Sequence, residues 1–127
     1  MKEIIFRGKR MDNGEWVYGS YLFLHISSVD WTGAKRGKPE DVHYIVNDQD
    51  INYAVYPSTI GQYTGLEDKN GKRIFEGDIL SFRTGRTHVV RFEDGAFILE
   101  GSSIPMRFAN KFEVIGNITD NPELLEK

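Results

Sequence analysis

The chain of 127 residues contains no cysteine, which excludes disulfides, thiolate metal sites, iron–sulfur clusters and thiol nucleophiles. It has no apolar run of transmembrane length, and its first ten residues lack the apolar core of a signal peptide. Basic charge is also scarce, because 16 Lys and Arg face 19 Asp and Glu and the formal net charge is -3. We therefore expect a soluble cytoplasmic protein without cofactor, metal or membrane contact.

Sequence motifs of catalysis are missing as well. The three histidines have no metal-binding spacing, and no P-loop, dinucleotide fingerprint or nucleophile elbow occurs. The acidic segment at 47–52, NDQDIN, lacks the glycine and glutamate that a calcium loop needs downstream. Glu76 and Asp78 have a spacing that a general acid and base could use, but such a pair beside a glycine more often binds backbone N–H groups. The sequence predicts no enzyme, and catalysis by Glu76 and Asp78 is the least favoured alternative.

Alternation with a period of two dominates what the sequence does contain. Aromatic and β-branched residues occupy every second position in several short segments, which is typical of half-buried strands. Turn signals separate these segments at 12–14, 70–71, 84–85 and 94–95. The sequence therefore predicts a mainly β protein made of antiparallel meanders.

A boundary near residue 73 divides the chain into two small antiparallel β lobes that form one structural unit. The first lobe, 1–73, includes a long polar loop at 30–41, in which Trp31 is a candidate contact residue. The second lobe, 74–127, has short strands predicted at 74–83, 87–93, 96–100 and 112–118. Their number and length favour an SH3-like barrel.

The C-terminal residues carry the best helix start in the chain. Asn121 is a good N-cap, Pro122 suits the first helical position, and Glu123 complements the positive end of the helix dipole. The sequence predicts a short C-terminal helix of one or two turns after the barrel.

Three arginines form a candidate nucleic-acid face on the second lobe. Arg83 and Arg91 alternate onto the side opposite Phe82 and Phe92, and Arg86 lies in the turn between them. Such a face can bind nucleic acid through phosphate contacts and stacking. The alternative is the solvated polar face that a half-buried sheet presents to water.

Residues 60–78, IGQYTGLEDKNGKRIFEGD, combine glycines and acids in a specific order. The segment LEDKNGK is typical of a tight hairpin, and the motif as a whole reads as a hinge that fixes one lobe against the other. A binding groove at the same place is the alternative, because clefts between lobes commonly hold ligands. The motif residues that a partner would contact are Gly61, Gln62, Tyr63, Thr64, Gly65, Asp68, Gly71, Glu76, Gly77 and Asp78.

Four segments of the chain resemble the YopX family, a group of phage and prophage proteins of unknown function. These segments are IFRGKRMDNGEWVYGS, STIGQYTGLEDKNGKRIFEGDIL, VVRFEDGAFIL and FEVIGNITDNPELLEK. The resemblance covers nearly the whole chain, apart from the loop at 30–41. It implies a phage or prophage origin, the cytoplasm of a bacterial host and a mostly β fold with an SH3-like barrel, and it implies no activity.

The function that these observations favour is that of a phage accessory protein, a non-enzymatic module that binds a macromolecule. An unknown protein partner is favoured by the missing catalytic motifs and by the many aromatic residues. The alternative is a nucleic-acid-binding barrel of phage DNA or RNA metabolism that uses Arg83, Arg86 and Arg91. The oligomeric state is open, because exposed strand edges invite self-association.

Overall fold

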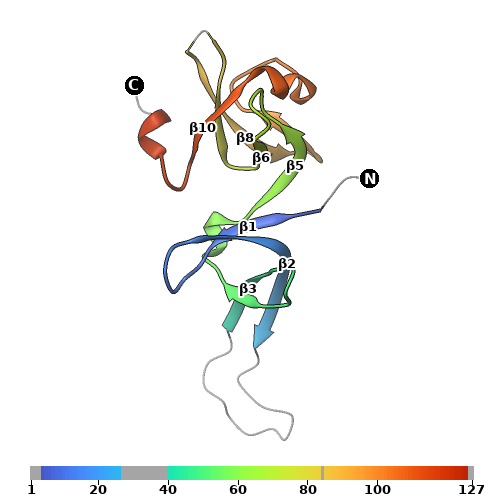
Figure 1. Cartoon of the computed structure of the whole chain (residues 1–127), viewed down its shortest axis with the longest axis vertical. Coiled ribbons are helices and arrows are strands. Elements are labelled where there is room, and N and C mark those ends of the chain that lie inside the picture. Colours follow the sequence, from blue (N-terminus) through green and yellow to red (C-terminus); the bar gives the residue numbers. More distant parts are fainter. Residues whose placement is uncertain (1–3, 27–39, 84, 126–127) are drawn as a thin grey trace, which may run out of the picture. The chain divides into compact units, whose positions relative to one another are not determined.

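The computed structural model describes residues 4–26, 40–83 and 85–125, which contain ten β-strands and three short 3-10 helices (Figure 1). Its contacts divide the chain into two compact units. Unit 1 is made of Met1–Ile4 and Gly61–Lys127, and unit 2 of Ile5–Ile60. The predicted loop at 30–41, with Trp31, lies outside the described residues except for its last two positions.

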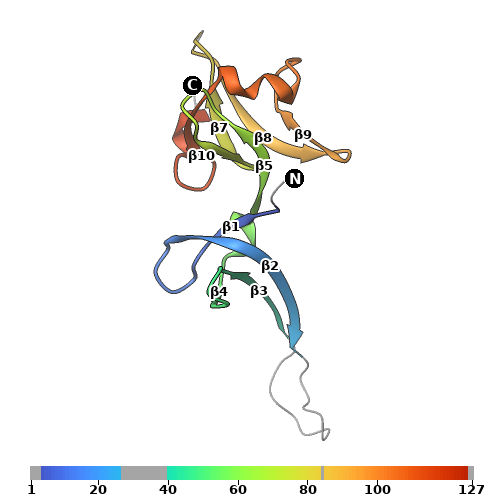
Figure 2. The ribbon, with the colours of Figure 1, turned by 45° about the vertical axis from the view of Figure 1, so that its right-hand side comes forward.

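Unit 2 is built on antiparallel strands in the order β4-β3-β2-β1. The strands are β1 (Phe6–Lys9), β2 (Trp16–Ile26), β3 (Glu40–Val46) and β4 (Asn52–Ala54), followed by the 3-10 helix η1 (Pro57–Thr59). Gly14 supplies the positive φ, 73°, that closes the tight turn between β1 and β2. Ile45 and Val55 are buried at 0% and 1% exposure. Figure 2 shows β2 and β3 continuing together as a two-stranded ribbon.

Unit 1 holds a hairpin and a four-stranded antiparallel sheet. The hairpin consists of β5 (Gly61–Glu67) and β6 (Arg73–Phe75), which pair at Tyr63↔Phe75 and Glu67↔Arg73. The sheet has the order β10-β7-β8-β9. Its strands are β7 (Asp78–Ser81), β8 (Thr87–Glu93), β9 (Ala96–Leu99) and β10 (Glu113–Asn117), with the 3-10 helices η2 (Met106–Lys111) and η3 (Pro122–Leu125).

The hydrophobic core of unit 1 follows from the alternation seen in the sequence. Leu80 and Val90 are fully buried, and each points to the same side of the sheet as its cross-strand neighbours, because paired residues share a face. The end of η2 closes this side. The buried core residues are Ile74, Leu80, Val90, Leu99, Ala109 and Phe112.

The predicted mainly β class with antiparallel pairing is confirmed, and so is the hairpin at LEDKNGK. The division between the units lies at Ile60/Gly61 instead of 73/74, because Ile74 belongs to the core of unit 1 and Leu66 packs against it. The predicted strand 74–83 is wrong in one respect: it is two strands, separated by a turn at Glu76-Gly77.

The SH3-like barrel stays a prediction. Among the described residues the strands of this sheet pair in the order β10-β7-β8-β9, without a pairing between β9 and β10 that would close a barrel. Where the sequence predicts a helical turn, the four residues of η3 form a 3-10 helix with Pro122 at its start.

Candidate binding surfaces

The motif of residues 60–78 lies in unit 1, where it forms the β5–β6 hairpin and the first residue of β7. Much of it is buried: Tyr63 and Thr64 are 7% and 6% exposed, and Asp78 is 2% exposed. Gln62 and Glu76 are half-buried and are joined by the bond that the Glu76 N–H donates to the Gln62 carbonyl. The motif residues therefore do not share one exposed surface.

Asp68 organises the hairpin turn of the motif. Its Oδ1 accepts the backbone N–H groups of Asn70 and Lys72 at 2.8 and 2.9 Å, and its Oδ2 accepts the N–H of Val114 at 2.9 Å. Burial of the carboxyl acts to raise the Asp68 pKa, but these three donors outweigh it, and the pKa lies below its ordinary value. The side chain thus links the turn to the start of β10 while it is charged.

Asp78 likewise accepts a backbone N–H group, at the turn between β6 and β7. Its Oδ2 accepts the N–H of Phe75 at 2.8 Å, in a site that is almost fully buried. Gly77 has φ 92° and joins two other segments, since its N–H donates to Val90 and its carbonyl accepts from Ile118. This geometry is what the interpretation of Asp78 as a ligand of backbone N–H groups predicts.

Gly61 allows the chain at Glu76 to approach β5 closely, and Thr64 bonds β5 to β6. A Cβ at Gly61 would lie 2.4 Å from the carbonyl oxygen of Glu76, so a larger residue has no space there. Thr64 Oγ1 donates to the carbonyl of Ile74 at 2.8 Å and accepts the N–H of Leu66 at 3.1 Å. Both residues therefore have local structural roles within unit 1, and the hinge between the two lobes stays a prediction.

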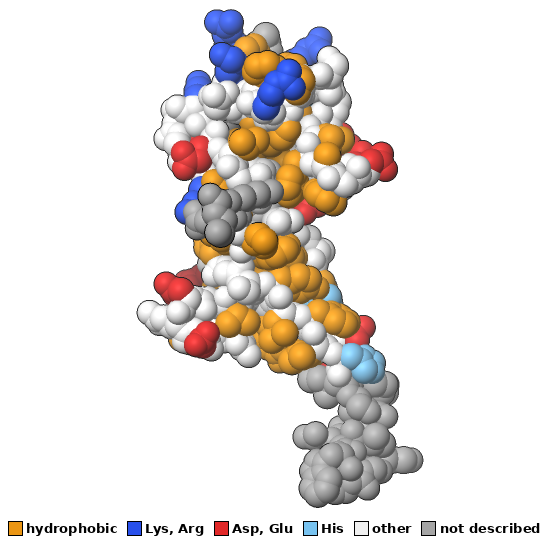
Figure 3. Space-filling model, turned by 90° about the vertical axis from the view of Figure 1, so that its right-hand side faces the viewer, with side chains coloured by type: hydrophobic (Ala, Val, Ile, Leu, Met, Phe, Trp, Pro, Cys, Tyr) orange, Lys and Arg blue, Asp and Glu red, His pale blue; other side chains and the backbone are white. Residues whose placement is uncertain are grey.

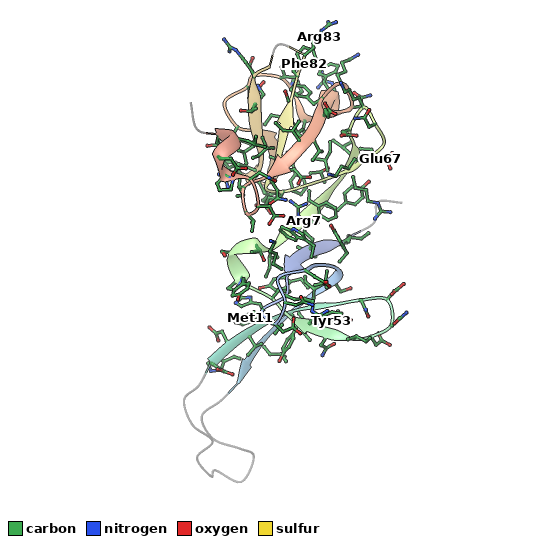
Figure 4. The ribbon with its side chains drawn as sticks, turned by 60° about the vertical axis from the view of Figure 1, so that its left-hand side comes forward. Arg7, Met11, Tyr53, Glu67, Phe82 and Arg83 are labelled. Atoms are coloured by element: carbon green, nitrogen blue, oxygen red, sulfur yellow. The ribbon has the colours of Figure 1, made fainter. Side chains whose placement is uncertain are left out.

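Arg83 and Arg91, two of the three arginines of the candidate nucleic-acid face, occupy different surroundings. The guanidinium of Arg83 lies over the ring of Phe82, 5.4 Å from its centroid, beyond the end of β7 (Figure 4). Arg91 lies within β8, where its Nε donates to Glu100 Oε2 at 2.8 Å. An acidic partner therefore offsets the charge of Arg91, whereas Arg83 lies next to an aromatic ring.

Sequence reasoning missed two further basic residues near this end of unit 1. Arg107 and Lys111 lie on η2, which packs beside the turn because the rings of Phe82 and Phe112 are 5.0 Å apart. The guanidinium of Arg107 lies 4.8 Å from the centroid of Phe108. Figure 3 shows Lys and Arg side chains gathered at one end of unit 1, with hydrophobic side chains between them.

The acid-free character of these two segments was readable from the sequence. Residues 81–92 and 101–112 contain no Asp or Glu, in a chain whose formal net charge is -3. Their five basic residues are Arg83, Arg86, Arg91, Arg107 and Lys111. We call Phe82, Arg83, Arg86, Arg107, Phe108 and Lys111 the cationic end of unit 1.

A second surface, which the sequence did not reveal, is the ribbon of unit 2, residues 20–26 of β2 paired with 40–46 of β3. On one face Tyr21 and Phe23 are 38% and 50% exposed, and on the other Leu24 is 42% exposed. Figure 3 shows hydrophobic side chains gathered on unit 2, with histidine at the margin of the group. Exposed apolar side chains on both faces distinguish this ribbon from an ordinary half-buried sheet.

The aromatic face of the ribbon is ordered by cross-strand contacts. The rings of Tyr21 and His43 are stacked, with a hydrogen bond of 2.6 Å between the Tyr21 hydroxyl and His43 Nδ1. Phe23 also packs on His43, with the two ring centroids 5.1 Å apart. His25 Nδ1 lies 2.7 Å from Asp41 Oδ1 at the far end of the same face. These contacts hold the side chains in fixed positions, as a recognition surface requires.

In residues 4–26, 40–83 and 85–125, no group of three His, Asp or Glu side chains could hold a metal ion. None of the helices in these ranges has the length and hydropathy that crossing a bilayer requires.

The family model described as YopX protein matches residues 5–126. The chain belongs to the YopX family. A crystal structure of protein EF1440 from Enterococcus faecalis is similar to it, with 27% sequence identity and a TM-score of 0.60, over 99% of this chain and 100% of that one. A search of the curated proteins gave no match. The YopX match spans both units, so the ribbon and the cationic end both lie within the family domain.

Proposed function

We propose that this YopX-family chain is a non-enzymatic accessory protein of a phage or prophage, which acts in the bacterial cytoplasm by binding another protein through the ribbon of unit 2. The observation that carries the proposal is the exposure of Tyr21, Phe23 and Leu24 on two faces of one pair of strands. Exposed apolar side chains gathered on one pair of strands in this way mark interaction sites in soluble proteins. Tyr and Phe also supply large contact area at a low cost in conformational entropy.

A protein partner suits the ribbon better than a nucleic acid does. The acidic side chains of the ribbon are Glu40 and Asp41, whose carboxylates repel phosphate, and residues 20–26 and 40–46 contain no Lys or Arg. The face is ordered by the bond between Tyr21 and His43 and by ring packing, which leaves its aromatic surface available to apolar side chains. Aromatic residues with few charges are the composition of protein interface centres.

The test compares two exposed phenylalanines of equal accessibility. Phe23 in the ribbon is 50% exposed, and Phe92 in β8 of unit 1 is 49% exposed. Immobilised wild-type protein, Phe23→Glu and Phe92→Glu are used to capture proteins from host lysate to which isotopically labelled wild-type chain has been added, followed by quantitative mass spectrometry. A partner retained by the wild type and by Phe92→Glu, and reduced at least tenfold with Phe23→Glu, supports the proposal. Capture that is equal for all three variants counts against the ribbon.

A second candidate function is binding of nucleic acid by the cationic end of unit 1, whose sheet we propose to be an SH3-like barrel. The specific observation in its favour is that Arg83 and Arg107 each lie over a phenylalanine ring, in two segments without acids. Guanidinium groups held at aromatic rings combine phosphate contact with stacking surface for bases.

Fluorescence polarisation with labelled single-stranded oligonucleotides tests this second function. We expect binding at low salt that weakens as salt rises, because each phosphate contact releases counterions. Arg83→Glu with Arg107→Glu should abolish it. A flat titration of the wild type at low salt overturns the nucleic-acid function and leaves the ribbon unaffected.

A further inference from the structure

One edge of the ribbon is open. β1 pairs with β2 only from Trp16 to Gly19, whereas β3 pairs with β2 from Ser20 to Ile26. In the part of the chain that the structure describes, no strand pairs with residues 20–26 on the side that β1 leaves free. We propose that this edge pairs with the same edge of a second copy of the chain, antiparallel and centred on Phe23. The inference rests on the proposed function, since it names the protein that the ribbon binds.

The direction of the backbone groups along this edge follows from a bond on the other side of the ribbon. The N–H of Val55 donates to the carbonyl of His43 at 3.0 Å, so that carbonyl points away from β2. His43 and Phe23 are directly opposite each other in the register of β2 and β3. They therefore form a non-hydrogen-bonded pair, and Phe23 directs its own N–H and C=O to the open edge.

A bond near the start of β2 gives the same alternation independently. The N–H of Arg10 donates to the carbonyl of Glu15 at 2.9 Å, so odd-numbered residues of this strand direct their polar groups toward the side of β1. Beyond the end of β1, these odd-numbered residues are Tyr21, Phe23 and His25. Their backbone donors and acceptors make a template for an added strand.

The sequence of the edge lacks the devices by which proteins protect an open strand. Residues 20–26, SYLFLHI, contain no Lys, Glu, Asp or Pro. The opposite edge of the ribbon carries Glu40 and Asp41, whose negative charges would repel the same edge of a second copy. Charge therefore favours self-pairing at the edge of β2 and disfavours it at the edge of β3.

Residues 20–26 are also complementary to the same residues of a second copy in antiparallel pairing. An added strand must offer apolar side chains on both faces, because those of β2 are exposed on both. Antiparallel pairing about a two-fold axis sets Phe23 opposite Phe23 of the second copy, Tyr21 opposite His25, and Leu22 opposite Leu24. Apolar cross-strand pairs then form on both faces, and no like charges meet. Pairing in this register makes the odd-numbered residues the hydrogen-bonded pairs, in agreement with the direction of their backbone groups.

Opposite charges at the axis give the sharpest test. Analytical ultracentrifugation of the wild type should show a monomer–dimer equilibrium, weak because the paired edge is short. Phe23→Glu and Phe23→Lys should each be monomeric, since each places two like charges face to face. A mixture of these two variants should restore the dimer, because a carboxylate then faces an ammonium group. Phe92→Glu, the matched control, should dimerise as the wild type does.

Amide exchange of the wild type tests the register without any substitution. On dilution below the dimer range, exchange at Tyr21, Phe23 and His25 should accelerate, while Leu22 and Leu24, bonded to β3 within the chain, stay slow. A wild type that is monomeric at every concentration, or mixed variants that stay monomeric, overturns the self-pairing. If the wild type does not self-associate but Phe23→Glu fails to capture a protein that the wild type captures, the ribbon binds a different protein and only the self-pairing is wrong. If Phe23→Glu captures every protein that the wild type captures, the proposed function fails as well.

Discussion

The carboxylate of Asp68 accepts the backbone N–H of Val114 at 2.9 Å, across 46 residues of sequence. Its other oxygen binds the turn of its own hairpin, through Asn70 and Lys72. One buried side chain therefore joins the most distinctive sequence motif of the chain to the last strand of unit 1. Asp68 and Asp78, two of the acids of that motif, thus bind backbone N–H groups.

Asp68→Asn should destabilise unit 1 by about 1–3 kcal/mol. The amide keeps the size of the side chain, but its NH2 group replaces one acceptor oxygen and leaves a buried N–H donor without an acceptor. Urea unfolding followed by the amide signal of Val114 measures the change. Asp12→Asn is the control, because Asp12 forms an exposed ion pair with Arg10, and its effect should be smaller. Equal effects at both positions would contradict the role of Asp68.

Stability at acid pH should depend on the same carboxyl. Its pKa in the folded protein lies below the ordinary value of 3.8, so the charged form is favoured by folding. The corresponding stabilisation is complete above pH 3.8 and is lost as the pH falls through the folded pKa. In Asp68→Asn this part of the acid sensitivity should vanish. Unfolding midpoints in urea between neutral and acid pH compare the two proteins, and parallel curves would show that Asp68 does not titrate as described.

Gly61→Ala should destabilise unit 1 by roughly 1–3 kcal/mol or more through steric overlap. Its Cβ would meet the carbonyl oxygen of Glu76 at 2.4 Å, and backbone atoms cannot move aside cheaply. Gly71→Ala separates this effect from backbone strain, since Gly71 has φ 81° and open space around it. That control should cost about 1 kcal/mol, from the left-handed conformation alone. Thermal or urea unfolding distinguishes them, and a smaller loss at Gly61 would be inconsistent with the close approach.

If the cationic end binds oligonucleotides, Arg83→Gln should reduce the slope of the salt dependence by about 1. Arg91→Gln should change it less, because Glu100 already offsets the charge of Arg91 through a bond of 2.8 Å. Glu100→Gln should strengthen binding slightly by releasing that arginine. Polarisation titrations at several salt concentrations measure the slopes of the three variants. Equal slopes for Arg83→Gln and Arg91→Gln would contradict the inference that Glu100 offsets the charge of Arg91.

Local features of the fold could be predicted from the sequence. The turn at Asn70-Gly71 and the alternation through Leu80 and Val90 depend on neighbours a few residues apart, and the structure contains both. The split at Glu76-Gly77 was not predicted, although Glu-Gly-Asp interrupts the apolar residues of this segment. The signal that could have found it is the glycine between two acids, a common place for a backbone turn.

The ribbon could not be predicted, for a physical reason. Its face exists because β2 and β3 pair in the register that sets Phe23 opposite His43 and His25 opposite Asp41. Those partners are separated by a long segment, and the side-chain period of a strand does not fix register across it. Arg107 and Lys111 were missed likewise, because only the packing of Phe82 on Phe112 brings η2 to the turn that carries Arg83.

The bond between Asp68 and Val114 also has a kinetic consequence. The hairpins β5–β6, β7–β8 and β8–β9 close over short stretches of chain, so each can form early and independently. β10 must return to β7 over a longer loop, which makes its docking entropically more expensive. We expect the last strand to join late in refolding, with the Asp68 carboxylate already positioned by its own turn to receive it.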